Sequence, residues 1–396
     1  MTPSARVQAA IELLDQIIIA ARDGGAAADV LIARYWKERR YAGSKDRRAV
    51  RELVYRAIRR SGERPASGRA AMIGLVEDDP DLAPLFTGEG HAPAPISANE
   101  TGSLASAVPA WFVPHLYPQI GAAEQAAMHE RAPLDLRVNR LQASREAISA
   151  LLPDALPVAG LPDALRLASD SAIDRLPAYR DGLIEVQDAG SQWLAAACET
   201  QPGMKVIDLC AGAGGKTLAL AAAMDNRGQI LACDISRPRL QQLAPRAERA
   251  GATMIDTLLL NPGKETDMLA GYEGQADIVL IDAPCSGSGT WRRNPESRWR
   301  LTPDRLARLV ETQAMLLDIA RKLVAPGGKL VYAVCAITRD EGAQQVEAFV
   351  RRHSGWVADE AIGDARWPGR HVGAGRLLTP LHDGTDGFYF ARLQRS

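Results

Sequence analysis

The sequence has few cysteines, no long apolar run and no excess of either charge. Its five cysteines are widely spaced and form no CxxC pair, which argues against a disulfide framework and against a zinc site. No apolar stretch is long enough to cross a bilayer. Glu12 and Asp15 interrupt the apolar run near the N-terminus, which predicts an amphipathic helix rather than a signal peptide. Because free thiols are typical of a reducing compartment, we expect a cytoplasmic protein without a metal. We also expect a monomer.

The formal net charge of -1 says nothing about partners, but the charges are unevenly distributed along the chain. Residues 1–70 contain 15 Lys and Arg against 8 Asp and Glu, whereas residues 71–107 contain 6 acidic residues and no basic ones. Such an asymmetry can mark a segment that faces nucleic acid.

Apolar residues at helical spacing predict three helices in the first part of the chain, over 5–22, 27–41 and 46–60. One face of the third helix carries five arginines: Arg47, Arg48, Arg51, Arg56 and Arg59. This basic face suits RNA, and a solvated helix surface explains it equally well. Residues 62–107 predict a linker with one short helix near 70–77.

The rest of the chain mixes strands and helices, which indicates an α/β fold. Residues 108–180 predict a small α/β unit, with a strand over 134–139 and a helix capped by Ser144. Residues 181–396 alternate apolar strands with helical segments. The predicted strands cover 205–210, 228–234, 253–260, 276–282 and 327–335. This alternation is typical of a doubly wound, Rossmann-like parallel sheet that helices cover on both faces. The sequence therefore predicts three domains, over 1–107, 108–180 and 181–396.

Thiols and carboxylates follow four of the predicted strands. They are Asp208 with Cys210, Asp234, Asp282 with Cys285, and Cys335. Ligands of doubly wound sheets bind outside the carboxyl ends of the strands. These side chains therefore predict a functional site at that edge of the sheet.

The glycine loop CAGAGGKT, from Cys210 to Thr217, fits three kinds of ligand site. A dinucleotide fingerprint GxGxxG would need glycine in place of Thr217, and a GxxxxGK[ST] phosphate loop would need glycine in place of Cys210. The third kind of site binds adenosylmethionine. There the glycines let the backbone approach the ligand, and Asp234 accepts hydrogen bonds from the ribose. The loop alone does not choose between the three.

The cysteines favour the adenosylmethionine site. A thiolate that adds to C6 of a cytosine makes C5 nucleophilic enough to take a methyl group, which divides a hard reaction into two easier steps. A free cysteine has a pKa of about 8.5, so such a nucleophile needs surroundings that activate it. Cys285 and Cys335 are both candidates because each follows a strand near Asp282, and the residues alone leave the choice open. Cys198 and Cys233 are predicted to be small buried apolar residues.

Three segments, VIDLCAGAGGKT, LIDAPCSGSGTWRRNPESRW and KLVYAVCAITRDEG, resemble signature blocks of the Nop/Sun family of RNA cytosine-5 methyltransferases. Further blocks agree, namely LRVN, GLIEVQDAGSQWLA and LTPLHDGTDGFYFARL, so the resemblance covers about residues 108–396. The segment GSKDRRAVRELVYRAIRR at 43–60 is similar to the NusB-like helical RNA-binding module of the bacterial RsmB branch. The resemblance implies S-adenosyl-L-methionine-dependent methylation of cytosine C5 in RNA, with 16S rRNA favoured and tRNA as the alternative. It also implies that residues 108–180 bind RNA.

The resemblance implies a role for each site residue. The cofactor-binding residues would be Cys210, Ala211, Gly212, Ala213, Gly214, Gly215, Lys216, Asp234, Asn261 and Asp282. Cys335 would be the nucleophile that adds to C6, Cys285 would help to release the product, and Asp282 would hold or protonate the N3 edge of the base. The family usually has Thr and Ser on either side of the nucleophile, where this chain has Val334 and Ala336. We expect this difference to affect the rate of the reaction.

Arginines and tryptophans alternate after the Pro-Cys block, at Trp291, Arg292, Arg293, Arg298, Trp299 and Arg300. Such a segment is predicted to bind phosphates and to stack on a flipped base. The alternative is a loop whose tryptophans pack on the protein itself. Two other functions stay open at this point: a P-loop nucleotide hydrolase that binds ATP and Mg²⁺, and a non-catalytic rRNA-binding assembly factor on the same fold.

Overall fold

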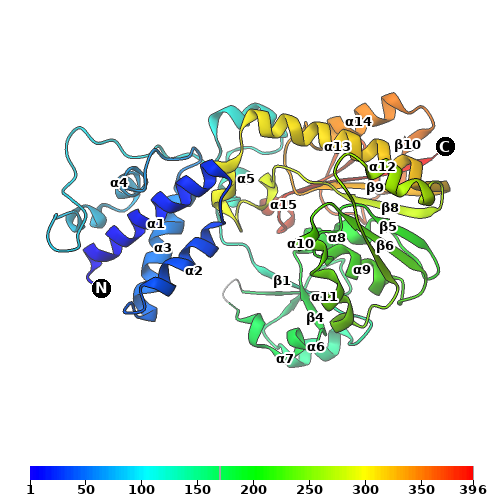
Figure 1. The fold of residues 1–396 in the computed structure, drawn as a ribbon, viewed down its shortest axis with the longest axis horizontal. Coiled ribbons are helices and arrows are strands. Elements are labelled where there is room, and N and C mark those ends of the chain that lie inside the picture. The colour runs from blue at the N-terminus through cyan, green and yellow to red at the C-terminus, as the bar shows by residue number, and fades with distance from the viewer. Residues whose placement is uncertain (169–170, 396) are drawn as a thin grey trace. The chain divides into compact units, whose positions relative to one another are not determined.

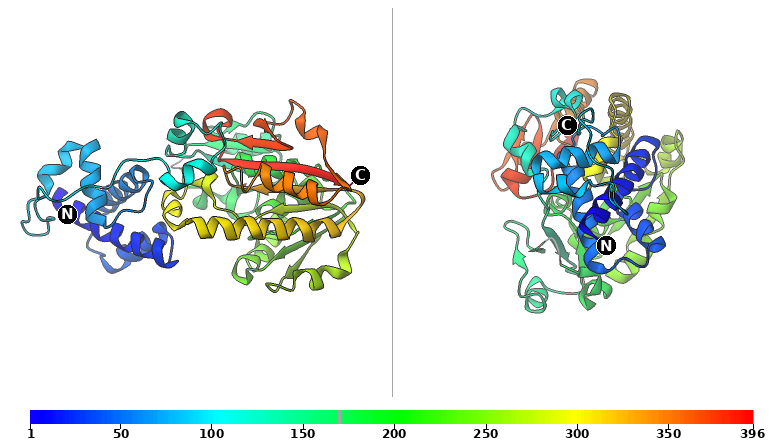
Figure 2. Two further views of the ribbon diagram at one scale, coloured as in Figure 1. Left: turned by 90° about the horizontal axis from the view of Figure 1, so that it is seen from above. Right: turned by 90° about the vertical axis from the view of Figure 1, so that its left-hand side faces the viewer.

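A computed structural model of the chain describes residues 1–168 and 171–395 (Figures 1 and 2). The chain divides into two compact units. The first contains Met1–Glu130 and Thr290–Arg305, and the second contains Arg131–Gly289 and Leu306–Ser396. The first unit thus includes residues 108–130, which the sequence analysis placed with the small α/β unit. Within the described ranges, no helix has the length and apolar character needed to span a membrane.

The first unit is helical. Its longer helices are α1 (Pro3–Asp23), α2 (Ala28–Glu38), α3 (Ser44–Arg60) and α4 (Gly68–Asp78), and its shorter ones are η1 (Pro80–Leu85), η2 (Ala110–His115), α5 (Ala122–Ala127) and η6 (Pro295–Arg300). The predicted N-terminal helices are therefore confirmed. The helix α1 packs against α2, α3 and α4 (Figure 1). A Cβ atom on Gly68 would lie 2.2 Å from the carbonyl oxygen of Ile11, so glycine permits the close crossing of α4 and α1.

The segment 290–305 belongs to the core of the helical unit, which makes the stacking prediction wrong for both of its tryptophans. Trp291 is completely buried, and Trp299 is 2% exposed and donates from Nε1 to the carbonyl oxygen of Ser61 at 2.8 Å. The guanidinium of Arg298 is buried too and donates to the carbonyl oxygens of Ile58, Arg59 and Ala107. Arg298 and Trp299 satisfy buried backbone groups of the unit, and the two buried tryptophans offer no ring face to a base.

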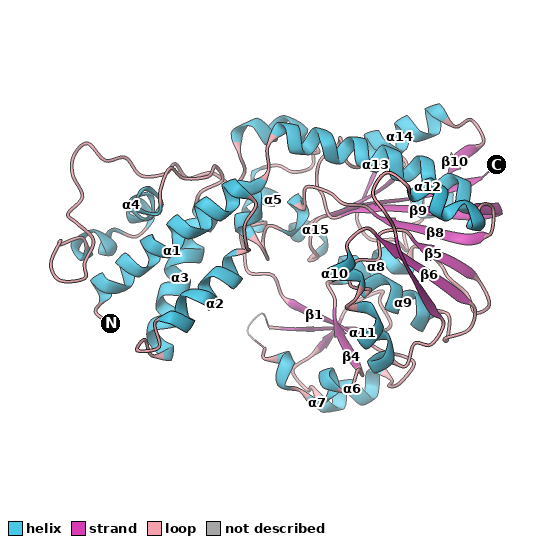
Figure 3. Ribbon diagram, in the orientation of Figure 1, coloured by secondary structure: helices cyan, strands magenta, loops and turns pink. Residues whose placement is uncertain are grey.

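The second unit contains two sheets (Figure 3). The smaller sheet is antiparallel, with the order β2-β3-β1-β4. Its elements are β1 (Leu134–Val138), α6 (Arg145–Leu151), β2 (Leu156–Pro157), β3 (Ala164–Leu167), η3 (Ile173–Arg175), α7 (Pro177–Arg180) and β4 (Ile184–Val186). The predicted strand over 134–139 is confirmed. Ser144 caps α6 as predicted, because its side chain accepts a hydrogen bond from the N–H of Ala147.

Nine strands of the described chain form the larger sheet, in the order β11-β12-β13-β9-β8-β5-β6-β7, with β10 paired to β13. The strands β5 (Lys205–Asp208), β6 (Gln229–Asp234), β7 (Ile255–Leu259), β8 (Ala276–Asp282) and β9 (Val324–Val334) are parallel, as predicted. The sequence analysis did not predict the antiparallel strands β10 (Trp356–Ala358), β11 (Arg370–Val372), β12 (Gly375–Leu378) and β13 (Phe388–Arg395). The sheet is therefore mixed, with a parallel half that carries the predicted site.

Helices cover both faces of the larger sheet. They are α8 (Ala189–Ala196), α9 (Gly215–Ala223), α10 (Arg237–Leu240), α11 (Leu243–Ala250), α12 (Glu265–Leu269), α13 (Pro303–Leu323), α14 (Ala343–Arg352) and α15 (Pro380–Asp383), with the short turns η4 (Ala270–Tyr272), η5 (Ser288–Thr290) and η7 (Glu360–Gly363). Figure 3 shows α8 and α9 on one face, with α13 and α14 on the other. This arrangement is the doubly wound fold that the sequence predicts.

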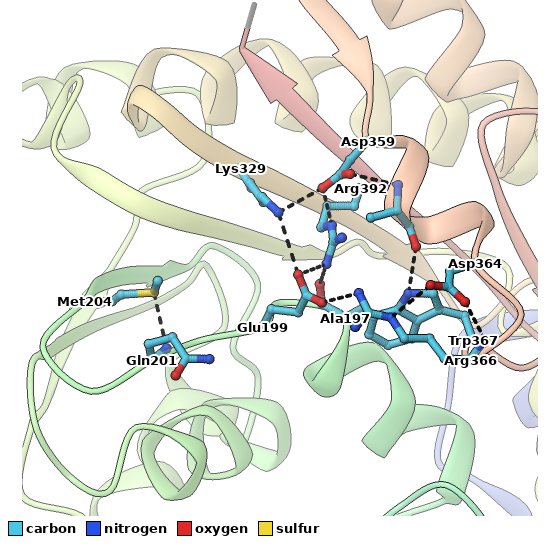
Figure 4. Close-up of polar contacts among 11 residues, drawn as sticks. Ala197, Glu199, Gln201, Met204, Lys329, Asp359, Asp364, Arg366, Trp367 and Arg392 are labelled. Carbon is cyan, nitrogen blue, oxygen red and sulfur yellow. Dashed lines mark hydrogen bonds and ion pairs between the residues drawn. The ribbon is translucent and has the colours of Figure 1, made fainter.

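A buried charge network fastens the antiparallel strands to the parallel half (Figure 4). Arg392 on β13 is completely buried and pairs with Asp359 at 2.7 Å and with Glu199 at 2.6 Å. Lys329 on β9 also pairs with Asp359, at 2.9 Å. Because Glu199 lies just after α8, the network joins elements that are far apart in the sequence.

Candidate active site

The loop after β5 takes a backbone shape that glycine alone adopts readily. Gly212 and Gly214 have φ angles of 57° and 86°, in the left-handed region. A Cβ atom on Gly214 would lie 2.0 Å from Cδ1 of Leu243, so the loop passes close against α11. The helix α9 begins directly after Gly214. The loop therefore brings the backbone of residues 210–216 to the carboxyl edge of the sheet.

Two strand-end carboxylates hold this loop in place. Asp234 accepts a hydrogen bond from the N–H of Gly212 on Oδ2 and one from the N–H of Ser236 on Oδ1, both at 2.7 Å. Asp208 accepts from the hydroxyl of Thr217 at 2.7 Å. Asp234 thus acts on the loop in this structure, and its proposed contact with a ribose would add to that role.

A cavity of about 320 Å³ opens beside the loop. Its lining residues are Val186, Gln187, Asp188, Ser191, Asp208, Cys210, Ala211, Ala213, Gly215, Lys216, Arg239, Arg246 and Asp282. Most of the predicted cofactor-binding residues thus surround one cavity. Four of the predicted residues are not among these lining residues, namely Gly212, Gly214, Asp234 and Asn261, and Asn261 lies exposed just after β7.

Sequence reasoning missed six of the cavity residues. They are Val186, Gln187, Asp188, Ser191, Arg239 and Arg246. The first four lie in the block GLIEVQDAGSQWLA, whose resemblance to the family was noted without a role for its side chains. Arg246 on α11 donates to the carbonyl oxygen of Ala213 at 2.5 Å and to Glu185 at 2.8 Å. An arginine on a helix with exposed neighbours carries no local signal of such a contact.

The carboxyl group of Asp208 is buried, and its pKa is higher than that of an ordinary aspartate. Burial and, to a smaller extent, the nearby Asp282 raise its pKa to about 7, against the opposing effects of the Thr217 hydroxyl and the Lys216 cation. Its Oδ1 atom is buried and has no hydrogen-bond partner in the structure. Asp208 therefore presents an unsatisfied acceptor at the cavity.

Lys216 and Asp282 form an ion pair between the loop and the end of β8. Their Nζ and Oδ2 atoms lie 2.7 Å apart, and the side chains are 10% and 31% exposed. Burial lowers the pKa of Lys216, but the attraction of Asp282, Cys335 and Asp208 outweighs burial, so the net pKa is raised. Lys216 is therefore positively charged at neutral pH, and its charge acts on Cys335, the predicted nucleophile.

The structure brings the two predicted reactive thiols together. Cys285 lies three residues after β8 and Cys335 directly after β9, and their Sγ atoms are 3.2 Å apart. The hydrogen bond to Cys335, burial and the carboxylate of Glu341 raise the pKa of Cys285 well above its usual value. Two thiolates this close would repel each other, and the raised pKa of Cys285 favours the protonated form of that thiol.

The remaining cysteines differ from this pair. Cys198 and Cys233 are completely buried, as predicted, and burial raises the pKa of both thiols. Cys210 lines the cavity, and burial, with the nearby Asp208, Asp282 and Asp234 carboxylates, raises its pKa well above the usual value. These three thiols stay protonated at neutral pH.

Comparison with known proteins identifies the family of this chain. The family profile of the 16S rRNA methyltransferase RsmB/F matches residues 195–394. The chain is 35% identical over 302 residues to a probable ribosomal RNA small subunit methyltransferase B from Synechocystis sp., an alignment that covers 73% of this chain and 67% of that protein. It is 33% identical over 292 residues to ribosomal RNA small subunit methyltransferase B from Escherichia coli, which covers 72% of this chain and 66% of that protein.

A solved structure shares the fold. A methyltransferase homologue from Pyrococcus horikoshii superposes with a TM-score of 0.62 and 24% identity, over 71% of this chain and 92% of that one. The alignments with the curated relatives span about two thirds of the relatives' length. The profile and the identities together show that the chain belongs to the RsmB/F family of 16S rRNA methyltransferases.

Proposed function

We propose that this protein transfers a methyl group from S-adenosyl-L-methionine to C5 of a cytosine in small-subunit rRNA, through a covalent bond between Cys335 and C6 of the base. The observation that carries the proposal is the pair of thiols, 3.2 Å apart, at the carboxyl ends of the neighbouring strands β8 and β9, on the sheet edge where Asp282 at the end of β8 lines the cavity. A cytoplasmic site of action is part of the proposal, because the relatives are named for ribosomal RNA.

The cavity residues fit the cofactor. Adenosylmethionine carries a positive sulfonium and ammonium and a negative carboxylate, and the cavity offers groups of both signs. Asp208 supplies an unsatisfied buried acceptor that suits an ammonium N–H. Arg239 and Arg246 supply guanidinium groups that suit a carboxylate. When bound, the cofactor supplies an electrophilic methyl group.

The protein's own side chains would carry the remaining steps. The thiolate of Cys335 forms a bond to C6, which makes C5 nucleophilic, while Asp282 holds the N3 edge of the base. After methylation, a water molecule takes the proton from C5, the electron pair of that C–H bond forms the C5=C6 double bond, and the bond between Sγ and C6 breaks, which returns Cys335 as a thiolate. Cys285 lies 3.2 Å away and assists this release. The cation of Lys216 stabilises the negative charge on Cys335 in both steps.

The helical unit contributes a surface for RNA. On α3, Arg48 and Arg51 are exposed, whereas Arg47 donates to the carbonyl oxygen of Ala42 and Arg56 pairs with Asp79. Exposed arginines are available to phosphates, and part of the predicted basic face is thus occupied within the unit. We propose that Arg48 and Arg51 contact the RNA backbone.

A methyl-transfer assay tests the proposal. Labelled adenosylmethionine is incubated with the protein and bare small-subunit rRNA or, separately, bulk tRNA, and the RNA is digested to nucleosides. Label in 5-methylcytidine of the rRNA is the expected result. Label in tRNA alone would reassign the substrate, and label in another nucleoside would overturn the chemistry.

A further inference from the structure

A second carboxylate lies buried behind the thiol pair. Glu341 follows Cys335 by six residues and is completely buried. Its Oε1 atom accepts hydrogen bonds from the backbone N–H of Ser286 at 2.7 Å and from Nε2 of Gln313 at 3.2 Å. Its Oε2 atom accepts from the hydroxyls of Ser286 at 2.6 Å and Thr338 at 2.7 Å. One carboxylate thus joins α13, the loop after β8 and the loop after β9.

These contacts hold both sides of Cys285. Ser286, the next residue, is bound to Glu341 through its backbone and its side chain. Pro284, the preceding residue, has its carbonyl oxygen bound by the same Nε2 of Gln313. The position of the Cys285 thiol therefore depends on groups that Glu341 organises.

The loop after β9 is tied to the same assembly. The backbone N–H of Ile337 donates to the hydroxyl oxygen of Ser288 at 3.1 Å, and the N–H of Gly289 donates to the carbonyl oxygen of Cys335 at 3.0 Å. The two loops that carry the thiols are therefore joined to each other as well as to Glu341. A shift of one loop would change the distance between the two sulfur atoms.

A carboxylate suits this position better than a neutral group. All four of its partners donate, and a carboxylate accepts on both oxygens, whereas an amide accepts on one and donates from the other. The four donors are neutral, so the buried charge is expensive in free energy compared with an apolar side chain. Holding two loops together for stability alone would not require that charge.

We propose that Glu341 is a positioning residue that holds the Cys285 loop, so that the thiol of Cys285 stays within reach of the bond between Cys335 and the base. This inference rests on the proposed function, in which Cys285 assists release of the methylated product. Glu341 does not touch the substrate, and it acts through Ser286 and Gln313.

The variant Glu341→Gln tests the proposal, with Glu347→Gln as the matched control because Glu347 is exposed on α14. We expect Glu341→Gln to bind adenosylmethionine as the wild type does, but to turn over about 10- to 100-fold more slowly, as misplacement of a reacting group by about 1 Å does. We expect a covalent protein–RNA complex to accumulate on denaturing gels. Unfolding cannot produce such a gain, because it removes the complex and cofactor binding together. The control should behave like the wild type.

Ser286→Ala provides a second, milder variant, since it removes one donor and keeps the backbone bond to Glu341. It should accumulate a smaller amount of the same complex. Wild-type turnover in Glu341→Gln without a trapped complex would overturn the positioning role alone. So would loss of cofactor binding in Glu341→Gln combined with wild-type behaviour of Ser286→Ala. Absence of methyl transfer by the wild type would instead overturn the proposed function, and the positioning role with it.

Discussion

The two thiols at the strand ends have different environments, although the sequence presents them as equals. Cys285 faces Glu341 and Cys335, which favour its protonated form, whereas Cys335 is influenced by the cation of Lys216. These surroundings support the nucleophilic role that we propose for Cys335. The buried Val334 and Ala336 beside it offer no hydroxyl, so we propose that Lys216 stabilises its negative charge.

The two cysteines should respond differently to mutation. Cys335→Ala removes the nucleophile and should lower methyl transfer by at least about 10³-fold, with no covalent RNA complex. Cys285→Ala should allow the adduct to form and slow its release, so that the complex survives denaturing electrophoresis. Retained activity in Cys335→Ala, together with its loss in Cys285→Ala, would exchange the two roles. Cys198→Ala, at a buried position away from the cavity lining, serves as the control.

Asp208 should make the stability of the apoprotein depend on pH. Its pKa is about 7 in the folded state and about 3.8 for an ordinary Asp, so the folded protein retains a proton that the unfolded chain loses between these values. The contribution of Asp208 to the free energy of unfolding therefore falls as the pH rises from about 4 to 7. Asp208→Asn should raise the melting temperature at pH 8, with a difference that shrinks towards pH 4, and should weaken cofactor binding. A constant difference in melting temperature across that range would contradict the assigned shift.

At the scale of elements, the glycine loop and the helix after it form one rigid support for the cavity. Gly214 combines a left-handed backbone with a close approach to Leu243 on α11. The loop is therefore tied to two helices and to the ends of β5 and β6 through Asp208 and Asp234. Periodicity predicted these strands, but it could not predict which helices would press against the loop.

Gly214→Ala should disturb both stability and cofactor binding. A left-handed alanine costs about 1–2 kcal/mol and overpacking against Leu243 about 1–3 kcal/mol more. We expect a loss of about 2–5 kcal/mol in denaturant unfolding, and loss of the thermal shift that adenosylmethionine produces in the wild type. Gly271→Ala is the matched control, because its Cβ would meet no atom within 4 Å. Equal effects of the two substitutions would contradict the importance of the loop geometry.

At the scale of the whole molecule, the charge network around Arg392 joins the antiparallel and parallel halves of the larger sheet. Asp359→Asn should lower the free energy of unfolding by about 3 kcal/mol or more, because it removes one partner of a completely buried cation.

The same network should make stability depend on pH. Burial raises the pKa of Asp359, but hydrogen bonds and charges of Lys329 and Arg392 outweigh burial and lower the net pKa. The stabilisation is therefore present above pH 4 or so and is lost as pH falls through the lowered pKa. Urea unfolding at pH 7 and pH 3 checks this, with the exposed Glu360→Gln as control.

The sequence was sufficient for features that depend on neighbouring residues, and insufficient for features that depend on distant ones. Helical spacing predicted α1 to α4, and apolar runs predicted β5 to β9 with the residues at their ends. The contacts of Arg246 and Glu341 join segments tens of residues apart, and nothing local distinguishes these residues from solvent-facing ones. The burial of Trp291 and Trp299 was mispredicted for the same reason. A segment of alternating arginine and tryptophan has the same local pattern whether it lies on a surface or in a core.

The core of the helical unit includes Trp299, which the chain supplies about 240 residues after the end of α3 at Arg60. A ribosome adds about 5–20 residues per second, so tens of seconds of synthesis separate the emergence of the first helices from that of the residue that completes their core. During this interval Ser61 and the end of α3 lack the donors of Arg298 and Trp299. The helical unit must therefore finish folding late during translation, after strands β5 to β8 of the larger sheet have been made, although its own helices are made first.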